Sequence, residues 1–435
     1  MQGMSLNDDI VAGSPPAAVD YDSAASSRRT TIESMSDISI DSDVIDNVYL
    51  VTGGAGFIGS HVSDYLLSRG DKVVVVDEMN DYYDVRLKEA NLNYLHSKHT
   101  DDIKFVVYKG DICDRDFMNN IFKSEKITHV CHLAARAGVR SSIADPFIYV
   151  HSNIEGTTRL LDLSRLYCIK NFVYASSSSV YGCSNLSILS EYDVVEKPVS
   201  PYAATKKACE LLAYTYHHLY GMNCTGLRFF TVYGPRGRPD MAPFKFIDRV
   251  HNSLPIQQYG DGSTSRDYTY IDDIVDGVVR AIDRPLGYEV INLGNGRPFQ
   301  LKEFIQLVEE SVGKNAIIEL CPEQPGDVER TCANINKAKS LLGYDPKTPF
   351  EVGINLTAQW YKSAASDGLF DVNEIPLNSS NEIISVPMTS ESQQRPHSER
   401  AFVTNAVTNS LSRLTVRLSK LLFSKISSFN LFRAS

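Results

Sequence analysis

Tyr202 and Lys206 stand four residues apart in the run Tyr202-Ala-Ala-Thr-Lys206, a spacing that places both side chains on one face of a helix. A tyrosine hydroxyl is a weak base near neutral pH, but a nearby ammonium group stabilises its phenolate. The serine-rich run Ser176-Ser-Ser-Ser-Val-Tyr-Gly182 precedes the pair, so Ser177 can share a proton with the phenolate. These residues predict a base that removes a hydroxyl proton while hydride leaves the same carbon. A surface Tyr and Lys beside a serine-rich loop is the alternative.

A glycine-rich run, Thr52-Gly-Gly-Ala-Gly-Phe-Ile-Gly59, follows an apolar segment and opens a helical pattern. Glycines at this spacing allow a tight turn, close approach of the backbone to a pyrophosphate, and close packing of the helix on the strand. The N–H groups at the start of the helix then face the phosphates. The run therefore predicts a dinucleotide site, and a plain strand–turn–helix is the alternative. The expected contacts are Gly53, Gly56, Phe57, Ile58 and Gly59.

Asp77 ends the next apolar run, about 20 residues after the glycines, where an acid can bind a ribose diol. A carboxylate suits a neutral diol and repels a 2′-phosphate, so the sequence favours NAD over NADP. Further contacts are expected at the carboxyl ends of the following strands, because ligands bind there in such sheets. These are Asp111 and Ile112 near the adenine, Leu133, Ala134 and Ala135 after the next strand, and Asn153, expected to hold backbone near the nicotinamide.

Short apolar runs alternate with helical patterns from residue 48 onward. The runs cover residues 48–52, 72–76, 104–108, 129–133 and 171–174. Strands buried on both faces of a parallel sheet are apolar almost throughout, and alternation with helices is typical of βαβ units. The sequence therefore predicts an α/β fold, a Rossmann-type doubly wound parallel sheet. Frequent Pro and Gly after about residue 234 predict a smaller C-terminal substrate lobe.

The chain is divided into five segments by its composition. Residues 1–46 are polar and predicted to be disordered, 47–231 form mainly the NAD-binding domain, and 232–361 form mainly the substrate lobe. Residues 362–399 are a Ser-rich linker, and 400–435 are a basic amphipathic helix with leucines at helical spacing and no acidic residue. That helix can dock on a partner or lie on a membrane surface.

Charge and cysteine usage narrow the class of protein. The formal charge of -10 over 435 residues argues against a nucleic-acid binder, which usually carries a basic patch. The eight cysteines include no Cys-x-x-Cys pair and no zinc-ligand spacing, so we expect reduced thiols and no metal site. We find no stretch of about 20 apolar residues and no signal-peptide pattern. We therefore expect a cytoplasmic protein, with residues 400–433 as a possible contact with a membrane surface.

The segment from Gly53 to Lys206 resembles the extended short-chain dehydrogenases/reductases, and longer segments resemble the UDP-glucuronate 4-epimerases within that family. These are Asn80-Asp-Tyr-Tyr-Asp-Val-Arg-Leu-Lys88, Tyr202-Ala-Ala-Thr-Lys-Lys207, Gly226-Leu-Arg-Phe-Phe-Thr-Val-Tyr-Gly-Pro-Arg-Gly-Arg-Pro-Asp-Met-Ala242 and Arg266-Asp-Tyr-Thr-Tyr-Ile-Asp-Asp273. The resemblance covers residues 47–361 and leaves both tails outside.

The resemblance implies a role for each matching residue. Tyr202 is the base, Lys206 its activator and Ser177 its hydroxyl partner. The other implied contacts are Phe229 near the nicotinamide, Ser178 and Ser179 in the sugar pocket, Thr231 and Arg238 on the sugar carboxylate, Arg266 on the diphosphate and Asp327 near the uridine ribose. The family also implies a homodimer.

The expected reaction is 4-epimerisation of UDP-glucuronate to UDP-galacturonate with bound NAD. Related 4,6-dehydratases carry Asp-Glu where Ser178 and Ser179 stand here, so the resemblance disfavours elimination of water. Three alternatives stay open: a 4-epimerase of neutral UDP-sugars, a UDP-glucuronate decarboxylase, and a non-catalytic nucleotide-sensing scaffold that acts through its basic tail.

Overall fold

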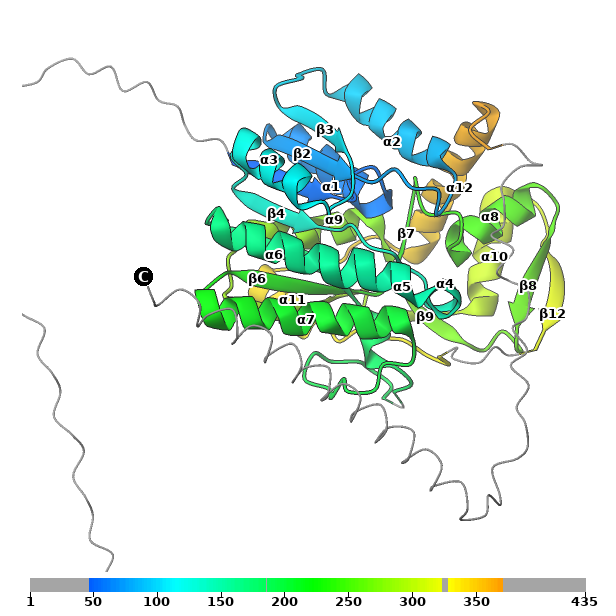
Figure 1. The fold of residues 1–435 in the computed structure, drawn as a ribbon. Coiled ribbons are helices and arrows are strands. Elements are labelled where there is room, and N and C mark those ends of the chain that lie inside the picture. Colours follow the sequence, from blue (N-terminus) through cyan, green and yellow to red (C-terminus); the bar gives the residue numbers. More distant parts are fainter. Residues whose placement is uncertain (1–46, 185, 323–327, 371–435) are drawn as a thin grey trace, which may run out of the picture. The chain divides into compact units, whose positions relative to one another are not determined.

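The computed structural model describes residues 47–184, 186–322 and 328–370. Its largest element is a seven-stranded sheet with the strand order β10-β6-β5-β4-β1-β2-β3 (Figure 1). Every neighbouring pair in this sheet is parallel. The predicted doubly wound parallel sheet is confirmed, because the chain builds outward from β1 in both directions. The strands are β1 (Val48–Thr52), β2 (Lys72–Asp77), β3 (Phe105–Lys109), β4 (His129–His132), β5 (Asn171–Ser177), β6 (Cys224–Phe229) and β10 (Tyr288–Leu293).

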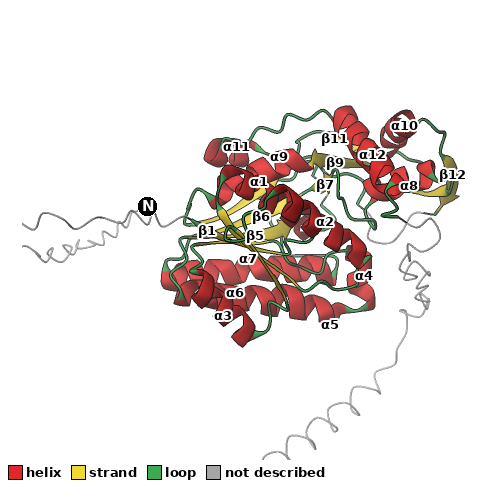
Figure 2. Ribbon diagram, turned by 90° about the horizontal axis from the view of Figure 1, so that it is seen from above, coloured by secondary structure: helices red, strands yellow, loops and turns green. Residues whose placement is uncertain are grey.

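Helices cover both faces of this sheet, which explains why its strands are apolar. Figure 2 shows α6 and α7 on one face and α1 and α9 on the other. Every residue of β1 and of β4 is buried between these layers. The helices and turns are α1 (Phe57–Arg69), α2 (Val85–Lys98), α3 (Arg115–Glu125), α4 (Val139–Ala144), α5 (Pro146–Tyr149), the π-helical η1 (Val150–Glu155), α6 (Gly156–Leu166), the 3-10 turn η2 (Ser178–Tyr181), α7 (Pro201–Tyr220), α9 (Ile271–Ile282) and α11 (Asn336–Leu342).

The second lobe is smaller and lies beside the carboxyl end of the large sheet. It holds a three-stranded sheet in the order β11-β9-β7 and a two-stranded sheet of β12 and β8. The strands are β7 (Thr231–Tyr233), β8 (Pro255–Tyr259), β9 (Ser265–Tyr270), β11 (Pro298–Gln300) and β12 (Ile317–Cys321). The helices are α8 (Ala242–His251), α10 (Leu301–Val312) and α12 (Phe350–Ser366).

The predicted boundary at residue 231 does not separate two independent units. The strand β10, from the C-terminal part, pairs in parallel with β6, from Tyr288 opposite Cys224 to Leu293 opposite Phe229. The helix α9 packs against α1 on the face of the same sheet. The chain therefore enters the second lobe, returns to complete the large sheet, and enters the second lobe again.

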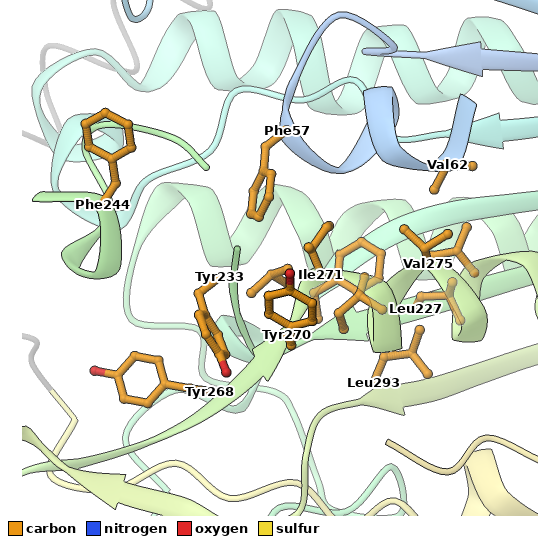
Figure 3. Close-up of a cluster of buried hydrophobic side chains, with 14 of the residues drawn as sticks. Phe57, Val62, Leu227, Tyr233, Phe244, Tyr268, Tyr270, Ile271, Val275 and Leu293 are labelled. Atoms are coloured by element: carbon orange, nitrogen blue, oxygen red, sulfur yellow. The ribbon is translucent and has the colours of Figure 1, made fainter. Parts of the chain in front are cut away.

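One apolar cluster joins the two lobes. Phe57 of α1, Phe244 of α8 and three tyrosines of β7 and β9 belong to it: Tyr233, Tyr268 and Tyr270 (Figure 3). Tyr233 contacts Phe350 of α12 edge to face, with ring centroids 5.3 Å apart. The loops that leave β7 and enter α8 are thus anchored in the same core as the start of α1.

The structure alters one predicted boundary and leaves both tails untested. Helix α12 continues to Ser366, so residues 362–366 extend that helix and do not start the Ser-rich linker. The predicted disordered segment, the rest of the linker and the basic helix lie outside the described residues. No helix in the described ranges is long and apolar enough to cross a membrane. All eight cysteines are free thiols.

Candidate active site

The first turn of α7 carries Tyr202. The helix begins after Ser200, whose side chain accepts a hydrogen bond from the N–H of Ala203 and caps the helix, and Pro201 occupies the first helical position. Tyr202 and Lys206 therefore lie one turn apart on the same face. The ring of Tyr202 packs edge to face on Tyr149, with centroids 6.2 Å apart. The helix start thus fixes the backbone position of the candidate base.

Lys206 and Ser177 connect α7 to the end of β5. The Lys206 side chain is buried, and its Nζ donates to the carbonyl of Ala175 over 2.8 Å. Ser177 is the last residue of β5, and its Oγ accepts a hydrogen bond of 3.1 Å from the N–H of Ser179. Ser177 lies opposite Phe229 of β6. A serine hydroxyl, a fixed ammonium and a tyrosine therefore border one place at the carboxyl end of the sheet.

A cleft of about 400 Å³ opens above the carboxyl ends of the central strands. It lies beside β1 and β4, where the strand order reverses and where ligands bind in doubly wound sheets. Most of the residues predicted from the sequence line it: Gly53, Gly56, Phe57, Ile58, Gly59, Asp77, Asp111, Ile112, Leu133, Ala134, Ala135, Ser177, Ser178, Ser179, Tyr202, Lys206, Phe229, Thr231 and Arg238.

The glycine-rich loop packs too closely for larger residues. Gly53 has a φ of 70°, and a Cβ there would lie 2.8 Å from the backbone of Ala134. A Cβ on Gly59 would lie 2.2 Å from the carbonyl oxygen of Gly53. Gly56 caps α1 without a side-chain hydrogen bond, and the first turn contains no acidic residue. The N–H groups at the start of α1 are thus left for an anionic group such as a pyrophosphate.

Asp77 braces the same loop. Its carboxylate accepts hydrogen bonds from the N–H of Ala55 (3.2 Å) and of Met79 (2.9 Å). The buried Lys88 lies 3.8 Å from Asp77 and donates to the carbonyl of Asn80 over 2.9 Å. Burial lowers the pKa of Lys88, opposed by the charge of Asp77. Two carboxylate oxygens carry more acceptor sites than these bonds use, so Asp77 can still accept from a ribose diol.

Asp111, which lines the cleft, pairs with a histidine that sequence reasoning did not connect to it. Asp111 accepts from the N–H of Cys113 (2.8 Å) and lies 2.8 Å from Nε2 of His151. Burial alone would raise the pKa of Asp111, but these hydrogen bonds and the charge of His151 hold it below its usual value. An ionised Asp111 is therefore available at the edge of the cleft.

Asn153 does not line the cleft but supports a residue that does. Its Oδ1 accepts from the N–H of Arg136 over 2.8 Å, and its Nδ2 donates to the carbonyl of Arg136 over 3.0 Å. Nδ2 also donates to Thr205 Oγ1 over 2.9 Å. Asn153 lies in the π-helical turn η1, a geometry often found at functional sites. It acts on the backbone of the segment beside Ala134 and Ala135.

The other end of the cleft contains Thr231 of β7 and Arg238 of the following loop. The Arg238 guanidinium forms two hydrogen bonds with the carboxylate of Asp240, at 3.0 and 2.5 Å. Its Cζ lies 5.3 Å from the centroid of the Tyr82 ring. No hydrogen bond within the described ranges engages Nη1 of Arg238. The side chain is thus held in place by Asp240 and Tyr82, with one nitrogen left for a ligand.

Arg266, a predicted substrate residue, does not join this group. Arg266 lies on β9, and its guanidinium donates to the carbonyls of Ser265 (3.0 Å) and Glu329 (3.3 Å). The residues that line the cleft within the described ranges do not include it. Asp327 lies outside the described residues.

Several residues that line the cleft were not predicted individually. Tyr82, Tyr83 and Lys88 come from the loop after β2 and the start of α2, and Arg136 follows Ala135. The Tyr82 hydroxyl donates to the carbonyl of Ala137, which ties this loop to the segment after β4. The sequence did contain a signal for Tyr82, Tyr83 and Lys88, because residues 80–88 resemble a segment of the family. No spacing rule, however, predicts that these residues lie near Arg238.

Comparison with known proteins agrees with this geometry. The family profile described as GDP-mannose 4,6 dehydratase matches residues 50–357. A UDP-glucuronate 4-epimerase of Thermodesulfobacterium geofontis is 47% identical over 315 residues, which cover 72% of this chain and 96% of the relative.

Solved structures are similar over the same region. A Bacillus cereus UDP-glucuronic acid 4-epimerase, crystallised with UDP-glucuronic acid and NAD, superposes with a TM-score of 0.68 and is 35% identical, covering 73% of this chain and 99% of its own. A Thermotoga maritima UDP-glucose 4-epimerase with UDP-glucose also gives 0.68, with 33% identity over 73% of this chain and 99% of its own. Profile, identity and fold agree, and the chain belongs to the NAD-dependent epimerase/dehydratase family of extended short-chain dehydrogenases/reductases.

Proposed function

We propose that this protein catalyses the NAD-dependent 4-epimerisation of UDP-glucuronate to UDP-galacturonate. The observation that supports this substrate most directly is that Thr231 and Arg238 line the same cleft as Ser177, Tyr202 and Lys206. The cation and hydroxyl can bind a sugar carboxylate, and the other three residues can act on a hydroxyl. The identity of 47% to a UDP-glucuronate 4-epimerase points to the same substrate.

Proton transfer is assigned to Tyr202. As a phenolate it accepts the proton of the sugar 4-hydroxyl, and it returns that proton after the sugar has turned over as a 4-keto intermediate. The ammonium of Lys206, tied to the carbonyl of Ala175, stabilises the phenolate electrostatically. Ser177 donates a hydrogen bond to the reacting oxygen.

The cofactor site is built from the glycine-rich loop and the strand ends. Gly53, Gly56 and Gly59 with the start of α1 would hold the pyrophosphate, and Asp77 would accept from the adenosine ribose. When bound, NAD supplies the hydride acceptor and donor at C4 and is regenerated in each turnover. The loop has the tight packing that a dinucleotide-binding turn needs. A Cβ on residue 59 would lie 2.2 Å from the carbonyl oxygen of Gly53, so only glycine fits there.

The carboxylate contact is assigned to Arg238 and Thr231. Oxidation at C4 makes a β-keto acid, which loses CO₂ readily if its C–C bond aligns with the carbonyl π system. Arginine can hold a carboxylate in a fixed plane through its planar fork. Asp240 takes Nε and one terminal nitrogen of Arg238 and so fixes the plane, which leaves Nη1 to donate to the sugar.

The competing activities differ in what they need from this end of the cleft. A 4-epimerase of neutral UDP-sugars has no use for a cation beside Thr231, and a decarboxylase must leave the carboxylate free to align. A scaffold would need none of Ser177, Tyr202 and Lys206. We further propose a homodimer, as in the family, and contact of residues 400–433 with a membrane surface or partner.

The proposal is tested by incubating the purified full-length protein with UDP-glucuronate, UDP-glucose, UDP-N-acetylglucosamine and UDP-xylose, and identifying the products by NMR. UDP-galacturonate as the main product, without pentose, supports it. Turnover of UDP-glucose or UDP-N-acetylglucosamine with no change in UDP-glucuronate overturns the substrate assignment. UDP-xylose as the main product from UDP-glucuronate identifies a decarboxylase.

A further inference from the structure

Arg236 is an unusual residue for its position in the loop between β7 and α8. Its backbone has a φ of 61°, a left-handed conformation that disfavours residues with a Cβ. It lies inside a turn closed by a hydrogen bond of 3.2 Å from the N–H of Gly237 to the carbonyl of Gly234. Asparagine or glycine would adopt this conformation more easily. An arginine here therefore needs side-chain contacts that compensate for the backbone.

Those contacts all come from the large-sheet lobe. The Arg236 side chain is only 11% exposed, and its Nη2 lies 3.9 Å from the carboxylate of Asp64 on α1. Its Cζ lies 4.7 Å from the ring centroid of Tyr94 on α2. Its Nε donates to Nε2 of His61 on α1 over 3.3 Å. The loop of the second lobe is thus bound to two helices of the large-sheet lobe.

The hydrogen bond to His61 fixes the tautomer of that histidine. Nδ1 of His61 lies 2.9 Å from the carbonyl oxygen of Phe57, so Nδ1 must carry the proton. Nε2 is then an acceptor, as the Arg236 donor requires. Burial, together with the nearby Arg236 charge, lowers the pKa of His61 to about 3, which keeps the ring neutral.

Phe57 and Arg238 border the cleft, one at each end of this chain of contacts. Phe57 is the first residue of α1, and Arg238 follows Arg236 by two residues. A Cβ placed on the intervening Gly237 would lie 4.0 Å from the Phe57 ring. Movement of the loop relative to α1 would therefore shift the Arg238 guanidinium within the cleft.

We propose that Arg236 is a positioning residue for recognition of the sugar carboxylate: by binding His61, Asp64 and Tyr94, it holds the loop that carries Arg238 against the start of α1. This inference rests on the proposed function, in which Arg238 contacts the carboxylate. Arg236 does not line the cleft and touches no substrate itself. Its loss should therefore affect the charged sugar and spare neutral ones.

The test uses Arg236→Met, which keeps length and removes charge, and Arg236→Gly, which also relieves the left-handed backbone. Both variants are expected to raise KM for UDP-glucuronate and to lower kcat/KM by up to about 10²-fold, the effect of displacing a positioning group. Weak activity on UDP-glucose should stay within threefold. A control is Arg280→Met, which removes a partly exposed arginine of α9 that pairs with Asp276 and donates to the carbonyl of Leu342.

His61, the residue of α1 that accepts the hydrogen bond from Arg236, allows a second pair of variants that leaves Arg236 in place. His61→Gln keeps an oxygen that can accept from Arg236, whereas His61→Leu removes it. The former is expected to retain most of the preference for UDP-glucuronate and the latter to lose it. This pair decides the question should Arg236→Met fail to fold, as judged by its melting temperature and NAD binding.

The decisive measurement is the energetic coupling between Arg236 and Arg238, obtained from kcat/KM of the single and double variants. In the Arg238→Ala background, Arg236→Met is expected to have no further effect on UDP-glucuronate, because the group that it positions is absent. If the losses in kcat/KM from the two single variants multiply in the double variant, the inference on Arg236 is overturned while the proposed function stands. The same holds if Arg236→Met lowers kcat/KM equally for charged and neutral sugars in a protein that prefers UDP-glucuronate. A wild-type protein that turns over only neutral UDP-sugars overturns the proposed function, and the carboxylate role of Arg236 with it.

Discussion

The carboxylate of Glu210 and the guanidinium of Arg228 form a buried ion pair with two hydrogen bonds of 2.8 Å, Nε to Oε1 and an Nη to Oε2. Glu210 lies on α7 and Arg228 on β6, and each is almost fully buried. Ser176 donates to the same carboxylate over 2.7 Å. Since Ser176 precedes Ser177, this pair ties the helix of Tyr202 to the strand end that carries the candidate hydroxyl.

Arg228→Met is expected to destabilise the protein by about 3–5 kcal/mol, because the buried Glu210 carboxylate loses its guanidinium partner and keeps only Ser176 and Lys207 as donors. Chemical denaturation followed by fluorescence measures the change. The matched control, Arg280→Met, removes a partly exposed pair with Asp276 and should cost about 0–1 kcal/mol. The double variant Glu210→Met with Arg228→Met should recover much of the loss. A single variant as stable as the control would show that the pair does not hold α7 in place.

The buried His129 and His132, together with the partly buried His61, predict loss of stability in mild acid. Burial lowers the pKa of His61 and His132 to about 3 and that of His129 to about 4, against 6.5 for the exposed group. Below pH 6.5 these histidines therefore bind protons in the unfolded chain but stay unprotonated in the folded protein. Stability should be fully present above that pH and should fall progressively as pH drops toward 4, by up to about 1.4 kcal/mol per unit and histidine.

Melting temperatures between pH 7.5 and 4.5 measure this slope. His132→Gln should flatten it, because one of the three groups is gone, whereas His218→Gln on the exposed side of α7 should not. His132 contacts Thr52 and Thr157, so the variant is also expected to melt lower at pH 7.5. Parallel curves for all three proteins would remove His132 from the acid response.

Tyr202→Phe is expected to abolish turnover and spare NAD binding. The ring can still pack on Tyr149, but the hydroxyl that accepts the proton is missing, and loss of such a base costs about 10²–10⁴-fold in rate. Rates come from NMR of the products, and NAD content from the absorbance of the denatured protein. Activity within threefold of wild type would exclude Tyr202 as the base.

Arg238→Ala is expected to weaken turnover of UDP-glucuronate by about 2–5 kcal/mol, the cost of removing one partner of a buried charge pair. The remaining turnover should release UDP-pentose by decarboxylation, and UDP-glucose should gain relative to UDP-glucuronate. Arg280→Met is the control, because it removes an arginine that does not line the cleft. Equal losses on both sugars in Arg238→Ala would mean that this arginine only supports the loop.

Deletion of residues 394–435 is expected to leave kcat and KM unchanged, since the segment lies outside the region matched by the family, residues 50–357. The acid-free, leucine-containing sequence of 400–433 predicts that only the full-length protein sediments with vesicles containing phosphatidylserine. Uncharged phosphatidylcholine vesicles are the control. Equal sedimentation of both proteins would leave partner docking as the function of the tail.

The sequence predicted the first five strands to within three residues at each end, because strands buried on both faces are apolar throughout. It did not predict that β10 completes the large sheet. Its partner β6 lies far away along the chain, and periodicity carries no information on which strands pair. Between β6 and β10 the chain passes through the second lobe, so the two strands do not follow each other as a βαβ unit.

Residues within one motif were predicted better than contacts between motifs. Tyr202, Lys206 and the glycines follow local rules of helix and turn geometry. The pairing of Arg238 with Asp240 is local as well, but a charge pair two residues apart has no sequence signature. The contact of Arg238 with Tyr82, and that of Arg236 with His61, depend on how two lobes meet, which no local pattern encodes.

The position of β10 also matters while the protein is being made. Until Leu293 has left the ribosome, β6 is an edge strand whose N–H and C=O groups on one side have no partner. A growing chain that has emerged only to residue 231 can form most of the nucleotide-binding half. It still exposes the unpaired edge of β6 and the surface that α9 will cover. Premature termination in this interval should therefore yield aggregates in place of a smaller active enzyme.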